Sequence, residues 1–256
     1  MQFVDTHTHL YSSEFDTDRE AAVHKAVESG VEIMLLPNID HTSWQPILDL
    51  CSQFPSNCFA MAGLHPTSVL PETVESEMAE VALQLESGNY IAIGEIGIDL
   101  YWDKSYQVLQ EEVFLYQVQL AKKYKLPVAV HVRKSFGEVW RILKSESGTG
   151  LKGVFHCFPG DEMQARQVID AGFMLGIGGV VTFKNSHLQK VVAAVGPEHI
   201  ILETDAPYLA PAPYRGKRNE PSFIPVIAEK VAELCGLSVE VVAEITTGNA
   251  KRLFNL

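Results

Sequence analysis

The chain has 256 residues, of which 46% are hydrophobic and 20% are charged, and its 20 basic and 32 acidic side chains give a formal net charge of −12 at pH 7. This composition is typical of a globular protein with a sizeable core, and it argues against a disordered chain or a small disulfide-stapled scaffold. The negative charge argues against broad electrostatic capture of nucleic acid or anionic membranes. It leaves room for a local basic patch and for a cluster of acids that binds cations.

The spacing of the four cysteines and the sequence of the first ten residues indicate the cellular compartment. No C-x-x-C pair is present, so neither a structural zinc motif nor a dense disulfide framework is indicated. The opening residues MQFVDTHTHL place an acid and two histidines where a signal peptide has basic and then apolar residues, and no apolar run reaches the ~18 residues of a membrane span. We therefore expect a complete, cytoplasmic protein with reduced thiols and no membrane partner.

Eight short apolar runs rich in β-branched residues recur along the chain, which is typical of buried strands. The predicted strands are Phe3–His9, Val31–Pro37, Cys58–His65, Ile91–Ile98, Pro127–Arg133, Gly153–Phe158, Phe173–Gly178 and Ile200–Asp205. Their starts lie roughly 28 residues apart on average, close to the roughly 30 residues of a strand-helix-strand unit.

Segments with helical periodicity separate these runs. In the segment 108–124, for example, Leu109, Val113, Tyr116 and Leu120 fall on one helix face. The predicted helices are Asp16–Ser29, Thr42–Phe54, Thr73–Ser87, Val108–Tyr124, Ser135–Lys144, Asp161–Ala171, Ser186–Val195, Phe223–Cys235 and Val239–Phe254. The last of these is expected to pack back on the rest of the fold.

Strict alternation of strand and helix over eight units predicts an α/β fold, a (β/α)8 TIM barrel, and the length fits a single domain over residues 1–256. A doubly wound open sheet is the alternative. It is disfavoured because no glycine-rich phosphate-binding fingerprint follows the first strand.

Polar residues gather at the carboxyl ends of the predicted strands, where the catalytic groups of a barrel lie. The residues at these ends are His7, His9, His65, Glu95, Asp99, His131, His156 and Asp205, whereas His24, His41, His187 and His199 fall in helices or loops and read as surface residues. A single buried histidine is more often a hydrogen-bonded core residue than a ligand. So many polar groups at one rim would nevertheless be costly to bury unless cations satisfied them.

These residue types are those of a metal site. His7 and His9 are two residues apart on a strand and so point to the same side, and two neutral imidazoles on one face suit a divalent transition metal. The candidate ligands are His7, His9, Glu95, His131, His156 and Asp205. A catalytic zinc ion uses only three protein ligands plus water, so six donors favour two ions about 3.5–4 Å apart that share a carboxylate and a water.

We expect Glu95 to bridge two divalent ions, with His7, His9 and Asp205 around one and with His131 and His156 around the other. Mixed histidine and carboxylate sites accept Mg, Mn, Zn or Ni according to supply, so the sequence does not identify the metal.

Neighbouring residues are candidates for substrate contacts. Arg133 follows His131 by two residues and points to the same side, where its guanidinium offers a fork for phosphate or carboxylate. The loop after the last strand carries the basic residues Arg215, Lys217 and Arg218 and the aromatic residues Tyr208 and Tyr214. Its plain interpretation is a solvated surface loop. Beside a metal rim it becomes a candidate phosphate clamp with an aromatic ring for base stacking.

Cys157 lies next to His156, which suggests a cysteine nucleophile. Adjacent residues of a strand point to opposite faces, so we expect Cys157 to face the helices and reject the thiol mechanism.

Seven strings in chain order carry a resemblance that spans nearly the whole sequence. They are DTHTHL at 5–10, GLHP at 63–66, GEIGID at 94–99, PVAVHVR at 127–133, FHCFPG at 155–160, ETDAPYLAP at 203–211 and the RNEP that starts at Arg218. With these strings the chain resembles the TatD family of metal-dependent deoxyribonucleases, within the amidohydrolase-like TIM barrels.

The resemblance implies metal ligands at the same six positions, and it implies that His65 of GLHP contacts a substrate phosphate. Glu95 stands where some related amidohydrolases have a carboxylated lysine, which favours the TatD branch over hydantoinase-like or phosphotriesterase-like branches. The family is associated with exonuclease action on DNA and, in some members, with ester hydrolysis such as the removal of D-amino acids from tRNA.

The expected function is metal-dependent hydrolysis of DNA phosphodiester bonds at single-stranded or end substrates. Cations lower the pKa of water for attack on phosphorus, Asp205 orients that water and accepts its proton, and Arg133 or His65 stabilises the phosphoryl charge. The first alternative is an ester or amide hydrolase such as a D-aminoacyl-tRNA deacylase, because the ligand set suits attack on a carbonyl equally well. A protein that only binds nucleic acid or metal is disfavoured because all six ligand positions are filled. The oligomeric state is not defined, and the sequence is compatible with a monomer.

Overall fold

The computed structural model describes residues 1–146 and 150–256, and in these residues eight parallel strands form one sheet in which each strand pairs with the next along the chain. The strands are β1 (Phe3–Asp5), β2 (Val31–Leu36), β3 (Cys58–Ala62), β4 (Ala92–Asp99), β5 (Val128–Arg133), β6 (Gly153–Phe155), β7 (Met174–Ile177) and β8 (Ile200–Leu202). A doubly wound sheet reverses its strand order at a switch point, so this sequential order excludes it.

Backbone hydrogen bonds join the last strand to the first. The N–H of Thr6 donates to the carbonyl of Leu202 at 3.0 Å, and the N–H of Asp205 donates to the carbonyl of His7 at 2.9 Å. These bonds close the sheet, so the predicted TIM barrel is confirmed and the open-sheet alternative is wrong.

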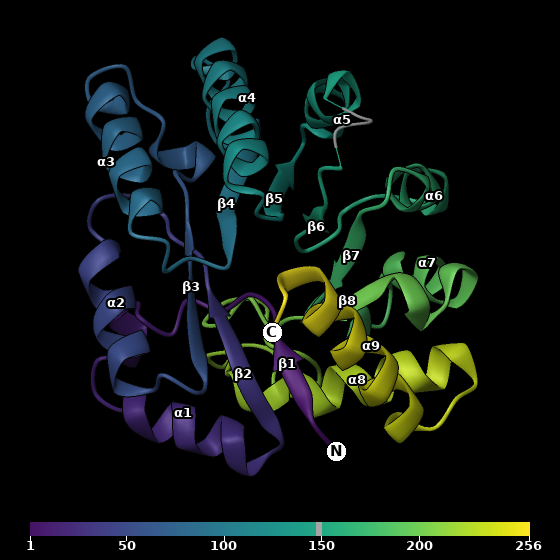
Figure 1. Ribbon diagram of the computed structural model, residues 1–256. Helices are drawn as coiled ribbons and strands as arrows, with labels where there is room; N and C mark the ends of the chain where they lie inside the picture. The colour runs from purple at the N-terminus through teal and green to yellow at the C-terminus, as the bar shows by residue number, and fades with distance from the viewer. Residues whose placement is uncertain (147–149) are drawn as a thin grey trace.

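Helices surround the strands, as Figure 1 shows in a view along the barrel. They are α1 (Arg19–Glu28), α2 (Trp44–Gln53), α3 (Val74–Glu86), α4 (Gln107–Tyr124), α5 (Phe136–Ser145), α6 (Glu162–Asp170), α7 (Leu188–Val195), α8 (Ile224–Cys235) and α9 (Val239–Phe254). Short 3-10 turns are η1 (Ser13–Phe15), η2 (Pro66–Ser68), η3 (Gly179–Thr182), η4 (Pro197–His199) and η5 (Pro221–Phe223). Each predicted helix is present with its ends displaced by a few residues at most. Among the described helices, none combines the length and the apolar character needed to cross a bilayer.

Local sequence explains two of the helix starts. Asp161 and Gln164 form a capping box at the start of α6. The Asp161 side chain accepts a hydrogen bond from the N–H of Gln164, and the Gln164 side chain accepts one from the N–H of Asp161. The side chain of Ser238 accepts from the N–H of Val241 at the start of α9. Such side-chain oxygens satisfy N–H groups that a helix leaves unpaired at its first turn.

The barrel interior is packed with apolar side chains at the end where the strands begin. One layer comprises Val4, Leu35, Met61, Ala92, Ala129, Val154 and Ile201 from seven strands, together with Ala250 and Phe254 of α9. Helix α9 therefore lies across this end of the barrel, with the C-terminus near the axis in Figure 1. Polar groups are left to the opposite rim, where the strands end.

Several strands end earlier than the sequence predicts. Predicted strands reach His9, His65, Phe158 and Asp205, whereas β1, β3, β6 and β8 stop at Asp5, Ala62, Phe155 and Leu202. Beyond these ends the chain turns sharply: Cys157 and Asp205 have left-handed backbones with φ of 43° and 58°. The predicted strand ends are wrong because several of the polar residues lie on turns that follow the sheet.

Candidate metal centre

The rim brings together all six predicted ligands and His65. His7 and His9 follow β1, His65 follows β3, Glu95 lies in β4, His131 lies in β5, His156 follows β6 and Asp205 follows β8. Their nitrogen and oxygen atoms form three overlapping groups, each within 4.8 Å: His7, His9 and Glu95; His7, His156 and Asp205; and His65, Glu95 and His131. These donors are the ones that divalent transition metals bind in proteins.

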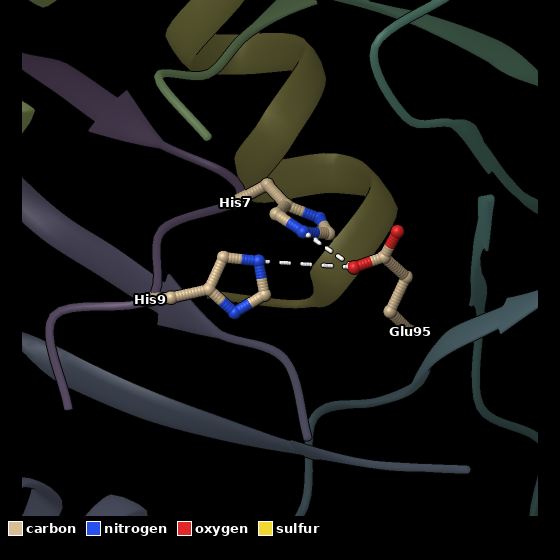
Figure 2. A group of neighbouring side chains, drawn as sticks. All are labelled: His7, His9 and Glu95. Carbon is tan, nitrogen blue, oxygen red and sulfur yellow. Dashed lines mark hydrogen bonds and ion pairs between the residues drawn. The ribbon is translucent and has the colours of Figure 1, made fainter. Parts of the chain in front are cut away.

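Glu95 occupies the middle of the cluster and presents a different oxygen to each side. Its Oε2 lies 3.0 Å from His7 Nε2 and 3.8 Å from His9 Nε2, as Figure 2 shows. Its Oε1 lies 2.6 Å from His131 Nδ1 and 3.4 Å from His65 Nε2. The Glu95 carboxylate thus lies between two groups of histidines.

Three of the histidines contact an outer partner through their second ring nitrogen. His9 Nδ1 lies 2.7 Å from the Tyr11 hydroxyl, and His131 Nε2 lies 3.0 Å from Asp99 Oδ2. His156 Nδ1 lies 3.1 Å from Oε1 of the fully buried Glu203. Histidines that bind metals are held in this way, with one nitrogen toward the ion and the other toward a carboxylate or hydroxyl. The cluster therefore fits a metal centre by geometry as well as by composition.

The pKa values of the inner carboxylates keep them ionised. Burial acts to raise the pKa of Glu95, but electrostatic interactions with the surrounding histidines and the hydrogen bond from His131 hold it well below its ordinary value. Burial likewise acts to raise the pKa of Asp205, and the hydrogen bond from His9 and the nearby histidine charges lower it. Both groups are thus anionic, as metal ligands must be.

The histidines differ in charge. Burial, together with the charge of His156, lowers the pKa of His7 to about 4, so its ring is neutral. Burial also acts to lower the pKa of His131 and His156, but hydrogen bonds from His131 to Asp99 and Glu95 raise the first to about 9, and the charges of Glu203 and Glu95 raise the second to about 10. In the metal-free cluster these two rings carry the positive charge that a divalent cation would replace.

The predicted substrate contacts occupy different surroundings. His65 lies inside the cluster, with Nε2 3.3 Å from His131 Nδ1. Tyr208 is exposed, and its ring centroid lies 6.3 Å from that of His9. Arg133 is exposed at the end of β5, in register with Asp99 of β4. These three residues lie at or beside the cluster, as the sequence suggests.

The two arginines of the loop after β8 are engaged by the protein. The Arg218 guanidinium lies 2.6 Å from Asp18 and 3.3 Å from Glu220, and it donates to the Glu14 carbonyl at 2.7 Å. The Arg215 guanidinium stacks over the Phe183 ring at 4.1 Å. The sequence predicts that these side chains bind phosphate, and the ion pairs of Arg218 with Asp18 and Glu220 argue against that role for Arg218.

Cys157 does not follow the strand alternation, so the prediction that it faces the helices is wrong. Because β6 stops at Phe155 and Cys157 has a left-handed backbone, its sulfur lies among the ligand atoms of His156 and Glu203. Burial and the charges of Asp205, Glu203 and Glu95 raise the pKa of its thiol well above the ordinary value. A protonated thiol is a poor nucleophile, so the thiol mechanism has no support in this geometry.

Two buried carboxyl groups that the sequence did not single out, Glu203 and Asp5, position the ligands. Glu203 Oε1 accepts from the N–H of Cys157 at 2.5 Å, and Gly176 leaves room for it because a Cβ there would lie 2.3 Å from Glu203 Oε2. Asp5 accepts from the N–H groups of His7 and Thr204 at 3.2 and 2.9 Å, which ties the end of β1 to the end of β8. Both had a signal: each lies two residues before a predicted ligand, on the same face of an extended chain.

Comparison with known proteins places this geometry in a family. The sequence model for TatD related DNase matches residues 4–255. The chain belongs to the TatD family. It is 38% identical over 253 residues to the metal-dependent hydrolase YabD of Bacillus subtilis, covering 98% of both chains. It is 33% identical over 258 residues to the 3'-5' ssDNA/RNA exonuclease TatD of Erwinia tasmaniensis, covering 98% of this chain and 99% of that one.

A solved TatD structure has the same fold. The crystal structure of YjjV, a TatD homologue from Escherichia coli, superposes with a TM-score of 0.91 at 28% sequence identity and covers 99% of this chain and 98% of that chain. The resemblance to the TatD family drawn from the seven strings is confirmed. The protein is a metal-dependent hydrolase of the TatD family with a histidine and carboxylate cluster able to bind metal.

Proposed function

We propose that this TatD protein hydrolyses phosphodiester bonds of DNA at single-stranded ends, using two divalent cations. The observation that carries the proposal is the placement of Glu95, whose two carboxylate oxygens face two separate groups of histidines. Paired cations are the common solution for phosphodiester hydrolysis, because they stabilise both the attacking and the leaving oxygen. The relative from Erwinia tasmaniensis that is named as an ssDNA/RNA exonuclease supports the choice of substrate.

The six ligands predicted from the sequence would hold the cations. We assign His7, His9 and Asp205 to one cation, with support from the 3.4 Å between His9 Nε2 and Asp205 Oδ1. We assign His131 and His156 to the other, since both approach Glu95 Oε1, and Glu95 to both. Divalent cations supply Lewis acidity, which makes water nucleophilic near neutral pH and stabilises charge on phosphoryl oxygens. Mg, Mn, Zn and Ni all suit this donor set.

Asp205 is suited to move the proton. Its side chain is 17% exposed whereas that of Glu95 is 3% exposed, so Asp205 lies nearer the mouth of the site. Its left-handed backbone, with φ of 58°, is held by the hydrogen bond from its N–H to the His7 carbonyl. With a lowered pKa it is an anion at neutral pH, able to orient a water and accept its proton.

His65 and Arg133 are placed to meet the substrate phosphate. The His65 side chain is largely buried beside Glu95, and its Nδ1 lies 2.6 Å from the Thr67 hydroxyl, which fixes the ring. Arg133 stands two residues beyond His131 along β5, about 6.6 Å further along the strand. Donors at these two places would hold a phosphate against the cluster and stabilise the charge that builds on it.

The test is hydrolysis of end-labelled single-stranded DNA with Mg²⁺ or Mn²⁺ and with chelator, comparing wild type with Asp205→Asn. Loss of a positioned proton acceptor is expected to lower the rate about 10²- to 10⁴-fold. Asp170→Asn, at an exposed aspartate at the end of α6, is the matched control and is expected to keep the wild-type rate. Cleavage that persists in chelator, or an Asp205→Asn rate equal to wild type, overturns the proposal. Turnover of aminoacyl-tRNA without turnover of DNA would favour the ester hydrolase instead.

A further inference from the structure

Two neighbouring aromatic side chains lie exposed at the rim directly after β4. Tyr101 is 52% exposed and Trp102 is 71% exposed, and their ring centroids lie 4.9 Å apart in an edge-to-face arrangement. The other two tryptophans, Trp44 and Trp140, are buried or half-buried. Exposed aromatic side chains grouped beside a candidate site are a candidate binding surface.

The Arg133 guanidinium covers both rings. Its central carbon lies 4.1 Å from the Tyr101 ring centroid and 5.1 Å from the Trp102 ring centroid. A guanidinium held over an aromatic ring can still bind an anion through its N–H donors.

The Arg133 side chain has no protein acceptor within the described ranges 1–146 and 150–256. Arg218, Arg141 and Arg19 each form an ion pair with a carboxylate, but Arg133 forms none. The acid nearest in sequence to the aromatic pair, Asp103, accepts instead from the N–H of Ser105 at 2.8 Å. The stacked guanidinium is therefore available to a ligand.

This group of three residues adjoins the metal cluster. The Tyr101 N–H donates to Asp99 Oδ1 at 2.9 Å, and the other oxygen of Asp99 lies 3.0 Å from His131 Nε2. Strands β4 and β5 approach closely here, because Gly97 has a φ of 148° and a Cβ at that position would lie 2.1 Å from the His131 carbonyl oxygen. A ligand bound on the rings would lie next to the cluster.

We propose that Tyr101, Trp102 and Arg133 form a subsite that stacks an unpaired nucleobase of single-stranded nucleic acid and binds a phosphate of the same strand through the guanidinium. This proposal rests on the proposed nuclease function. The subsite would give the enzyme its preference for single-stranded substrates. A base inside a duplex is covered on both faces by its neighbours, whereas a base in a single strand can offer a face to an aromatic ring. Every base has such a face, so the subsite tolerates any sequence.

The experiment measures binding without cleavage. Metal-loaded protein is titrated with a single-stranded oligonucleotide with cleavage-resistant phosphorothioate linkages, and with a matched oligonucleotide whose bases are replaced by abasic residues. The wild type is expected to bind the first about 5- to 100-fold more tightly, the range of one to two stacked bases. Stacking on the exposed Trp102 is expected to quench tryptophan fluorescence with the first oligonucleotide alone.

The variants separate stacking from other effects. Trp102→Ala is expected to bind the two oligonucleotides alike, and Trp102→Phe, which keeps a ring, is expected to stay within about threefold of wild type. Tyr116→Ala is the matched control, because Tyr116 is an exposed aromatic residue on α4 outside this group. Equal binding of the two oligonucleotides by wild type, or wild-type discrimination by both Trp102→Ala and Tyr101→Ala, overturns the subsite.

Failure of the subsite and failure of the nuclease function give different results. Tight, base-dependent binding with no cleavage of ordinary DNA in any cation would leave the subsite standing and overturn the nuclease function. Metal-dependent cleavage with wild-type KM in both Trp102→Ala and Tyr101→Ala would do the reverse.

Discussion

Two regions flank the histidine and carboxylate cluster, the loop after β8 and the ends of β4 and β5, and their arginines make different contacts. In the loop after β8, Arg218 is fixed by Asp18 and Glu220, and Lys25 of α1 also pairs with Glu220. On the side formed by β4 and β5, Arg133 is stacked on aromatic rings and has no acceptor among the described residues. Both regions carry basic residues in the sequence. The difference shows that a cation near a site is a candidate for ligand binding only when the fold has left its donors free.

The same loop is also held by neutral contacts. Asn219 donates through Nδ2 to the carbonyls of Thr204 and Tyr208 at 2.7 and 2.6 Å, and the rings of Tyr214 and Phe223 stack with centroids 4.3 Å apart. The loop after β8 therefore acts as a brace between α1 and the end of the barrel. The side formed by β4 and β5 has the character of a ligand surface.

The largest expected effect concerns the outer carboxylates, one on each side of the rim. Asp99 contacts His131 at 3.0 Å on the β4 side, and Glu203 contacts His156 at 3.1 Å on the β8 side. Replacing either one, by Asp99→Asn or Glu203→Gln, is expected to weaken metal binding about 10- to 100-fold, because the histidine loses the partner that orients it. Calorimetric titration of the metal-free protein with Mn²⁺ or Zn²⁺ measures this.

Asp99→Asn and Glu203→Gln are expected to lower metal affinity by similar factors. Glu233→Gln, at an exposed residue of α8, is the control and is expected to leave metal affinity unchanged. Wild-type affinity in Glu203→Gln alone would overturn the assignment of His156 to the same cation as His131.

The second prediction compares the effects of replacing Arg133 and Arg218. Arg133→Ala is expected to raise KM for single-stranded DNA about 10- to 100-fold, the loss of a charged hydrogen-bonding group, without a change in Tm. Arg218→Ala is expected to leave KM unchanged and to lower Tm by about 2–4 °C, because it removes a partly exposed ion pair of about 1 kcal/mol. Steady-state kinetics and thermal unfolding of both variants give the comparison. The opposite pattern would exchange the roles assigned to the two regions.

The smallest effect is a dependence of stability on pH in the loop after β8. The hydrogen bond from Arg218 lowers the pKa of Asp18. Burial acts to raise the pKa of Glu220, but hydrogen bonds and charge from Lys25 and Arg218 lower it. Because both values are lower in the folded chain, the pairs contribute stability above the ordinary carboxyl pKa of about 4 and lose it as the pH falls below that value.

The Tm difference between wild type and Arg218→Ala is therefore expected to be constant from pH 5 to 7 and to shrink below about pH 4. Thermal unfolding across that range measures it. A difference that grows on acidification would mean that Arg218 stabilises the loop by something other than these carboxylates.

The barrel and the clustering of its candidate metal ligands were predictable because both depend on local periodicity. Alternation of apolar runs marks the strands, and residues such as His7, His131 and Asp205 stand at the points where these runs end. Parallel strands of a barrel end at one rim, so residues far apart in sequence could be grouped without a structure. The six predicted ligands do lie together, and the number of ions they bind remains a prediction.

The rest depended on contacts that local pattern does not encode. The face of Cys157 was mispredicted because its N–H donates to the Glu203 side chain and its backbone is left-handed, and strand alternation does not continue through a left-handed residue. The pairing of Arg218 with Asp18 joins residues 200 positions apart, which no local pattern reveals. The stacking of Arg133 on Tyr101 and Trp102 depends on the turn that follows β4 and on the register of β4 with β5.

The apolar layer beneath the metal cluster gives the barrel a blind end. Side chains of seven strands together with Phe254 of α9 fill the interior at the opposite end from the cluster. Along the barrel axis, the cluster is therefore accessible from one end only. Cations, water and substrate enter at the open end beside Asp205, and products leave at the same end. Binding of the next substrate and release of the last product therefore compete for the same opening.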